Sequence, residues 1–105
     1  MRESTAFSFH PGAQGEYLAA TRYYLAEAST AVAAGFTTEL ETAIAAVLSA
    51  PTASRVIAAP GIRRYLLRRF PYALFYRWEP AQRHVTIYAI MHLSRRPDYW
   101  RARLS

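Results

Sequence analysis

The spacing of hydrophobic residues changes near Pro51, and this change limits the possible folds more than any other feature of the chain. Before it, apolar residues recur every three or four positions, as in a helix that buries one face. After it come short stretches rich in aromatic and β-branched residues, which are typical of strands. We therefore expect a helical half followed by a strand half.

The first half is predicted to contain two helices. One runs from about Gly12 to Ala28, and the other begins at a cap formed by Ser29 or Thr30 and continues to Ser49. Because the link is so short, they should form an antiparallel hairpin that packs on one sheet. The expected apolar stripe of the second helix consists of Val32, Phe36, Leu40, Ala43, Ile44 and Val47.

Four strands are predicted. The first spans Ala6 to His10, and after a turn-rich segment from Ala50 to Gly61 the others span Ile62 to Arg69, Tyr72 to Glu79 and His84 to Leu93. The last three should form an antiparallel meander, since their links are short. Alternation assigns Tyr72, Leu74, Tyr76 and Trp78 to one face of their strand, and directs Val85, Ile87, Ala89, Met91 and Leu93 toward the helices.

A chain of 105 residues with 52% hydrophobic residues is long enough for one domain with a real core. The predicted class is α+β: a single compact domain of order β-α-α-β-β-β, with a helical hairpin packed on an antiparallel sheet. The segment from Pro97 to Leu104 is expected to add a short C-terminal helical turn, with Pro97 at its first position.

Several classes of site are excluded by composition. The chain has no cysteine, which removes disulfides, thiolate catalysis and cysteine-ligated metals. His10 and His84 have no carboxylate or second histidine at ligand spacing, so we expect no metal and no cofactor. Neither a signal peptide nor a membrane span is expected, because no apolar stretch of the required length is present, and we expect a cytoplasmic location.

The charge is unevenly distributed. All 13 basic residues are arginine; residues 1–54 have two of them against five Glu, and residues 55–105 have 11 against two acids. The net charges are therefore −3 and +9, which points to an acidic partner, either a nucleic acid or an acidic protein segment, at the C-terminal half. An Ala-rich and Arg-rich composition is also what high-GC coding produces, and this accounts for part of the bias.

Several motifs follow one another in a fixed order along the chain: Tyr23-Tyr24, Phe36 with Glu39-Leu40 and Ala43-Ile44, Pro51, Gly61-Ile62-Arg63-Arg64-Tyr65, FPYALFYR at 70–77, IYAIMH at 87–92, and Arg95-Arg96-Pro97. Together they resemble the RelE/ParE superfamily of bacterial type II toxin–antitoxin toxins, also called the plasmid-stabilisation protein family. The resemblance covers nearly the whole chain and implies a single RelE/ParE-like toxin domain over residues 1–105. It also implies a small cytoplasmic protein and a neighbouring antitoxin that wraps it.

That superfamily includes ribosome-dependent mRNA endonucleases and DNA gyrase poisons, so the fold alone does not fix the target. In the ribonuclease branch, the resemblance assigns catalytic roles to Arg64, to Arg95 or Arg96, and to Tyr99; His92 is a further candidate general acid or base. The chain departs from that pattern at two positions. Ala73 stands where a catalytic arginine is usual, and Leu66 where a second basic residue is often found.

A second set of residues is predicted to bind the target or the antitoxin: Arg63, Arg68, Arg69, Arg77, Arg96, Trp100 and Arg101. Each has a structural alternative. The paired arginines beside the predicted strand at 62–69 can be a solvated edge, His92 can be a hydrogen-bonded structural residue, and Trp100 can pack the tail onto the sheet.

Because the arginine expected at Ala73 is missing, we favour a toxin that poisons DNA gyrase. A ribosome-dependent mRNA endonuclease and a non-toxic homologue that only binds antitoxin are the alternatives. In each case the partner is expected to be an acidic, partly disordered antitoxin segment that orders on the basic surface.

Overall fold

The helices form where the spacing predicts them. A computed structural model describes residues 5–96 and 98–104, and in it α1 spans Pro11–Glu27 and α2 spans Thr30–Ser49. Ser29 caps α2, since its hydroxyl oxygen accepts the N–H of Val32 at 3.1 Å, and α2 ends two residues before Pro51. The stripe of α2 is buried as predicted except at its first position, where Ala33 is buried and Val32 is exposed.

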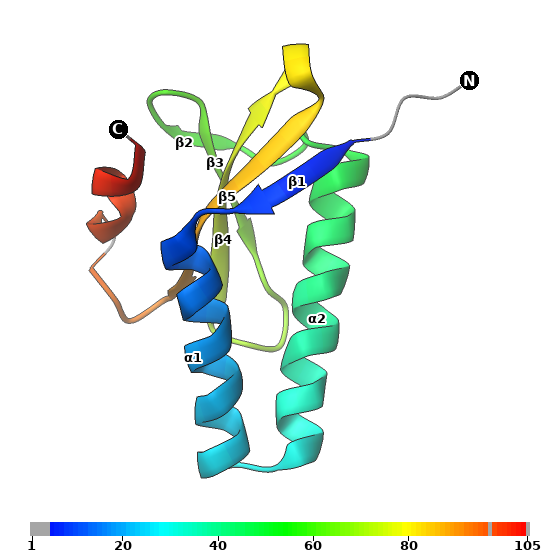
Figure 1. Cartoon of the computed structure of the whole chain (residues 1–105), viewed down its shortest axis with the longest axis vertical. Coiled ribbons are helices and arrows are strands. Elements are labelled where there is room, and N and C mark those ends of the chain that lie inside the picture. Colours follow the sequence, from blue (N-terminus) through cyan, green and yellow to red (C-terminus); the bar gives the residue numbers. More distant parts are fainter. Residues whose placement is uncertain (1–4, 97, 105) are drawn as a thin grey trace.

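The sheet has five strands in the order β1-β5-β4-β3-β2 (Figure 1). They are β1 (Ala6–Phe9), β2 (Val56–Ala58), β3 (Ile62–Leu66), β4 (Tyr72–Glu79) and β5 (His84–His92). A short 3₁₀ turn, η1 (Pro80–Gln82), joins β4 to β5, and a second, η2 (Tyr99–Leu104), forms the expected C-terminal turn. This confirms the α+β class and the order of the predicted elements; Pro97 lies outside the described residues.

Three details of the sheet differ from the expectation. The sheet is mixed and not wholly antiparallel, because β1 pairs with β5 in parallel, whereas β3, β4 and β5 form the predicted meander. An additional strand, β2, lies within the segment predicted to contain only turns, and β3 ends at Leu66 instead of Arg69. The segment that connects β1 to β5 contains the helical hairpin and the strands β2, β3 and β4, so it is long enough for the crossover that parallel pairing requires.

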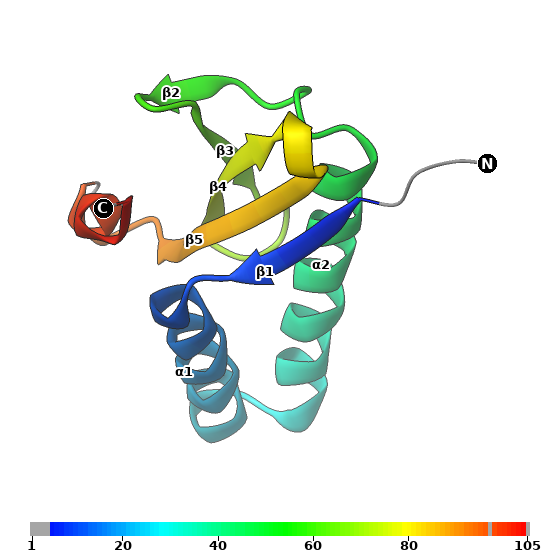
Figure 2. The same ribbon diagram turned by 45° about the horizontal axis from the view of Figure 1, so that its top comes forward.

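Side chains on the two faces of the sheet form separate cores. The helices lie side by side on one face (Figures 1 and 2), and Phe36, Leu40 and Val47 of α2 meet Leu74 and Tyr76 of β4 there. On the opposite face, η2 lies away from the helices and packs onto the sheet. That second cluster contains Ile62, Ala73, Phe75, Ala89, Met91 and Trp100.

A β-bulge in β5 overturns half of the predicted alternation. Phe75 pairs with Ala89 and Tyr76 pairs with Ile87, so Tyr88 is an extra residue. Val85 and Ile87 face the helices as expected, but Ala89 and Met91 belong to the opposite cluster. Their place on the helix face is taken by Ile90, and the strand β4, which has no bulge, keeps its predicted faces. The bulge therefore places the side chain of Ile90 on the helix face of the sheet.

By length and composition alone, α2 could cross a membrane, contrary to the expectation that no segment qualifies. Its apolar side chains already have a place in the domain, because Phe36, Leu40, Ile44 and Val47 are buried against the sheet. The composition of α2 is thus accounted for by its role as the main core helix.

Candidate functional site

The carboxylate of Glu16 on α1 is the centre of the largest polar cluster in the described part of the chain. It accepts hydrogen bonds from the N–H of Ile90 at 3.0 Å, from Arg95 Nη1 at 3.2 Å and from the hydroxyl of Tyr99. Arg103 donates through Nη1 at 2.9 Å and Nη2 at 3.3 Å. One helix residue thus holds the end of β5, the loop after it and η2 together.

Local backbone features make this cluster possible. Arg103 Nη1 also donates to the carbonyl of Tyr88 at 2.9 Å, so backbone groups at the bulge, at Tyr88, and just after it, at Ile90, have side-chain partners. Gly12, in the first turn of α1, leaves room for the guanidinium: a Cβ there would lie 2.6 Å from Arg103 Nε and 2.9 Å from Nη1. A larger residue at position 12 would therefore displace the guanidinium of Arg103.

Two guanidiniums lie over the ring of Tyr99. Arg95 Cζ is 3.8 Å and Arg103 Cζ 5.1 Å from its centroid, within range of cation–π attraction. Burial raises the pKa of the Tyr99 phenol, and its hydrogen bond to the Glu16 carboxylate and the charge of Glu16 raise it further, against the opposing charges of Arg95 and Arg103. Tyr99 is therefore held as a neutral hydrogen-bond donor.

Beside this cluster, a cleft of about 420 Å³ lies between α1 and the end of β5. Its lining includes Glu16, Tyr23 and Tyr24 of α1, together with Tyr72, His92 and Arg95. The rings of Tyr23 and Tyr24 meet edge to face at 5.4 Å, and those of Tyr72 and His92 at 5.0 Å. Burial raises the pKa of Tyr72 to about 12, with the charge of Tyr24 and a hydrogen bond to it adding to the effect.

The hydrogen bonds of His92 indicate its tautomer. Its Nδ1 accepts the backbone N–H of Ser94 at 3.1 Å and lies 2.7 Å from the Ser94 hydroxyl. A backbone N–H can only donate, so Nδ1 has no proton, and the proton of the neutral ring lies on Nε2. His92 is thus a hydrogen-bonded residue, as the structural alternative proposed, and it has one donor left at the lining of the cleft.

The residues predicted for RNA cleavage do not lie on one face. His92 and Arg95 line the cleft on the helix side, and Tyr99 lies next to Arg95. Arg64 is on the opposite face, because it pairs with Phe75, whose ring contacts Trp100 at 5.0 Å. Ala73 stands where an arginine is usual in the ribonuclease branch. It is 0% exposed in that same cluster, so this position is not accessible to a substrate.

Two of the arginines predicted to bind partners make hydrogen bonds within the domain. Arg63 Nη1 donates to the carbonyls of Ser54 at 2.6 Å and Thr52 at 3.2 Å, which fixes the segment before β2. Arg69 binds Glu39 of α2 through its backbone N–H at 2.8 Å and its Nε at 3.3 Å. Burial acts to raise the pKa of Glu39, but hydrogen bonds from Arg69 and Arg68 and the charge of Arg69 outweigh it and lower that pKa.

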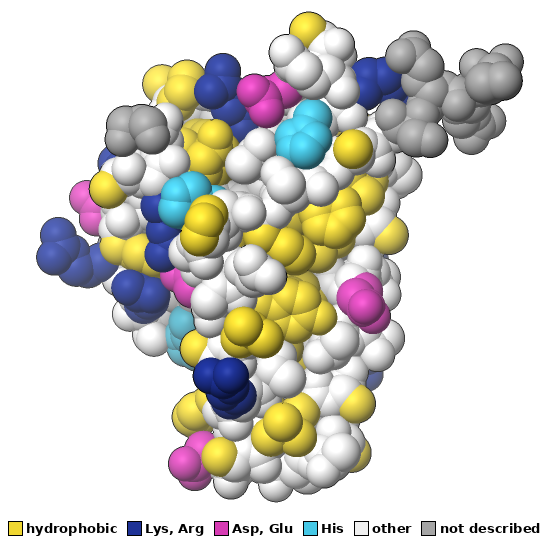
Figure 3. Space-filling view, in the orientation of Figure 1, with side chains coloured by type: hydrophobic (Ala, Val, Ile, Leu, Met, Phe, Trp, Pro, Cys, Tyr) yellow, Lys and Arg dark blue, Asp and Glu magenta, His cyan; other side chains and the backbone are white. Residues whose placement is uncertain are grey.

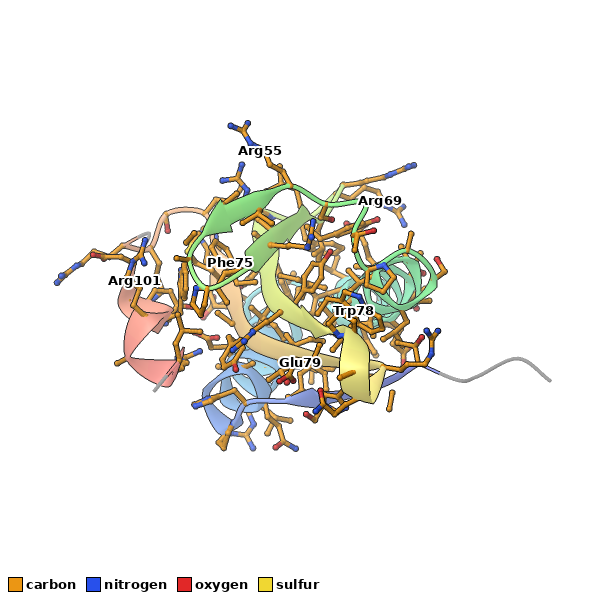
Figure 4. All side chains as sticks on the ribbon, turned by 90° about the horizontal axis from the view of Figure 1, so that it is seen from above. Arg55, Arg69, Phe75, Trp78, Glu79 and Arg101 are labelled. Atoms are coloured by element: carbon orange, nitrogen blue, oxygen red, sulfur yellow. The ribbon has the colours of Figure 1, made fainter. Side chains whose placement is uncertain are left out.

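The remaining predicted partner-binding residues divide between surface and core. Three of them are exposed: Arg68, Arg96 and Arg101. Arg77 is half-buried beside Ile62. On the face shown in Figure 3, basic side chains gather over η2 and the end of β5. Figure 4 shows Arg69 and Arg101 pointing outward from different elements. Trp100 is 1% exposed against Phe75, so it packs the tail onto the sheet, as its structural alternative proposed.

Sequence reasoning assigned no functional role to Glu16 or to the tyrosines of the cleft. The only signal for Glu16 is a carboxylate in an otherwise uncharged turn of α1, which is not specific. Among residues 5–96 and 98–104, no three His, Asp or Glu side chains are placed to hold a metal ion.

Comparisons with solved structures find the same fold. A chain of the chromosomal ParDE toxin–antitoxin system from P. aeruginosa matches with a TM-score of 0.73 and 16% identity, covering 87% of this chain and 98% of that one. The intact E. coli RelBE complex gives 0.63 and 18%, covering 89% and 100%, and the isolated E. coli RelE toxin gives 0.62 and 18%, covering 97% of each chain. No family model and no curated protein matches the sequence.

Proposed function

We propose, from the fold shared with ParDE and RelBE proteins, that the chain is the growth-inhibiting toxin of a type II toxin–antitoxin module, acts in the cytoplasm and is neutralised by a cognate antitoxin. The observation that carries the proposal is this fold over nearly the full length of each solved chain. The excess of arginine in residues 55–105 supports an acidic antitoxin segment as the neutralising partner.

DNA gyrase is the target we favour, with inhibition by binding. Metal-free RNA cleavage needs a group that takes a proton, a cation near the phosphate and an acid for the leaving oxygen. Here Tyr99 donates to Glu16 and has a raised pKa, Arg64 lies on the other face of the sheet from His92, and Ala73 is buried. That arrangement favours a toxin without a cleavage site.

One observation favours the RNA endonuclease alternative. His92 and Arg95, two of the residues assigned to that chemistry, line the same cleft. An exposed guanidinium and an imidazole with a free donor could contact a phosphate together. For this alternative to hold, His92 or Arg95 must support RNA cleavage although the arginine usual at position 73 is replaced by alanine.

The deciding experiment combines two readouts of the same chain, one on the purified protein and one in cells. Purified chain is added to gyrase in a DNA supercoiling assay, and primer extension across abundant transcripts is performed minutes after induction in cells without antitoxin. Inhibited supercoiling with intact transcripts is expected. New translation-dependent 5′ ends would establish the endonuclease, and a folded chain that neither stops growth nor affects either readout would establish the non-toxic homologue.

A matched variant separates binding from chemistry. Tyr99→Phe removes the hydroxyl but keeps the ring on which Arg95 and Arg103 stack. If Tyr99 has no chemical role, growth arrest should persist at an equal level of folded protein. Loss of a general acid or base commonly lowers a rate by about 10²–10⁴-fold, so abolished toxicity in a folded variant would contradict the gyrase proposal.

A further inference from the structure

We propose that the cleft between α1 and the end of β5 is a binding site for a small organic anion that carries a planar ring. The inference concerns a ligand of the free chain and is tested by binding, whereas the endonuclease alternative, which uses the same His92 and Arg95, is tested by cleavage of transcripts. It rests on three features that meet in the cleft: aromatic side chains, a cation that is held in place, and a volume suited to a ligand.

The aromatic side of the cleft is formed by α1. Tyr23 is 58% exposed at the rim, and its ring is held edge to face against Tyr24, which in turn contacts Phe70 at 5.2 Å. Ala19 and Ala20 add small apolar side chains next to it. An exposed tyrosine that is already held by its neighbours loses little rotamer freedom when a planar ring packs on it.

The cationic side is formed by Arg95 and His92. Arg95 is fixed by its stacking on Tyr99 at 3.8 Å and by one bond to Glu16 at 3.2 Å, yet its side chain stays 54% exposed. The rest of its guanidinium edge can therefore contact a carboxylate or phosphate. His92 lines the same cleft and has its proton on Nε2, a second donor for an anion.

The local charge leaves a cation for the ligand. Glu16 already has a partner in Arg103, which binds it at 2.9 and 3.3 Å with both side chains mostly buried, at 18% and 13% exposure. Arg95 is thus the surplus positive charge of a cluster that contains one carboxylate and two guanidiniums. A surplus cation at the wall of a cleft attracts an anion, since low-dielectric walls strengthen its field.

The size of the cleft fits a mononucleotide or an N-acylated aromatic amino acid, because small-molecule sites have volumes of roughly 300–1,000 Å³ and this cleft measures about 420 Å³. Both ligands share the recognised chemistry, a planar ring linked to an anionic group. The first represents a free nucleotide, and the second represents an aromatic residue at the carboxyl end of a peptide.

The test is an NMR titration of the uniformly ¹⁵N-labelled full chain. Adenosine monophosphate and N-acetyl-phenylalanine are the two probes, and adenosine (ring only) and inorganic phosphate (anion only) are the matched controls. We expect amide shifts at Ala19, Ala20, His92 and Arg95 with at least one probe, with an affinity at least tenfold above that of either control. Whichever probe binds more tightly identifies the source of the ligand.

Two variants examine the two sides of the site. Arg95→Gln and Tyr23→Ala should each weaken binding at least tenfold, whereas Arg55→Gln, an exposed arginine outside the cleft, should leave it unchanged. The NMR spectrum of each variant shows directly whether the fold is disturbed. Tyr23 is exposed, so Tyr23→Ala remains informative even if Arg95→Gln disturbs the tail. No cleft shifts up to about 10 mM of either probe, equal binding of phosphate alone, or unchanged binding by Tyr23→Ala would overturn the proposal.

Discussion

Replacing Glu16 with glutamine should detach the C-terminal segment from the body of the domain. The substitution keeps the size of the side chain but removes the charge that Arg103 and Arg95 share, and it places an amide N–H₂ group where one oxygen now accepts. Tyr99 and the N–H of Ile90 then compete for the one remaining oxygen.

The magnitude follows from the burial of each pair. Breaking a buried ion pair costs about 3–5 kcal/mol, and the Glu16–Arg103 pair, whose side chains are 13% and 18% exposed, approaches that case. The bond to Arg95 adds less than about 1 kcal/mol, because that side chain is 54% exposed. Because the freed groups are partly solvated, we expect the free energy of unfolding to fall by about 3 kcal/mol. This is a large part of the roughly 5–15 kcal/mol by which a typical domain is stable.

Urea unfolding followed by circular dichroism measures this loss, and limited trypsin digestion reports the tail, where Arg101 and Arg103 are cleavage sites. The melting temperature should fall by about 12 °C, and cleavage in η2 should precede cleavage elsewhere. Glu41→Gln, the same change at an exposed position of α2, should alter stability by less than about 0.5 kcal/mol. If both variants behave alike, Glu16 does not anchor the tail.

Three further outcomes are expected. Gly15→Ala should stabilise α1 by about 0.5–1 kcal/mol, because no atom beyond its chain neighbours and the nearby helix backbone lies within 4 Å of the new Cβ. Gly12→Ala should instead destabilise the chain in the same urea assay by displacing Arg103, and equal effects of the two variants would contradict the close approach. Arg63→Ala should cost about 1–2 kcal/mol through two lost bonds to loop carbonyls, and its neighbour Arg64, which is exposed, should tolerate alanine in the same measurement. The pKa of Tyr72 is raised from 10 in the unfolded chain to about 12 in the folded chain, so the free energy of unfolding should fall as pH rises through this window. Tyr72→Phe should flatten that fall in unfolding curves measured at several pH values. An unchanged slope would refute the assignment.

Much of the fold could be predicted, because local physics determines it. The apolar stripe of α2, its Ser29 cap and its end before Pro51 depend on residues a few positions apart, and the bounds of β4 depend on alternation within one strand. Features that depend on pairing could not be predicted in this way. The parallel β1–β5 pair and the three-residue β2 have no local signal, and the extra residue at Tyr88 reverses the faces that follow it.

The candidate site lies beyond what sequence spacing can show, because its members come together only through long-range pairing. Glu16 is separated from Arg95, Tyr99 and Arg103 by 79, 83 and 87 positions. The parallel β1–β5 pair places the start of α1 beside the end of β5, and the bulge then turns Ile90 and His92 toward it. Two side chains that resemblance assigns to chemistry thereby become partners of a helix carboxylate. A late arginine and a terminal tyrosine are thus no evidence of cleavage by themselves, since in this chain both donate to a carboxylate that α1 presents.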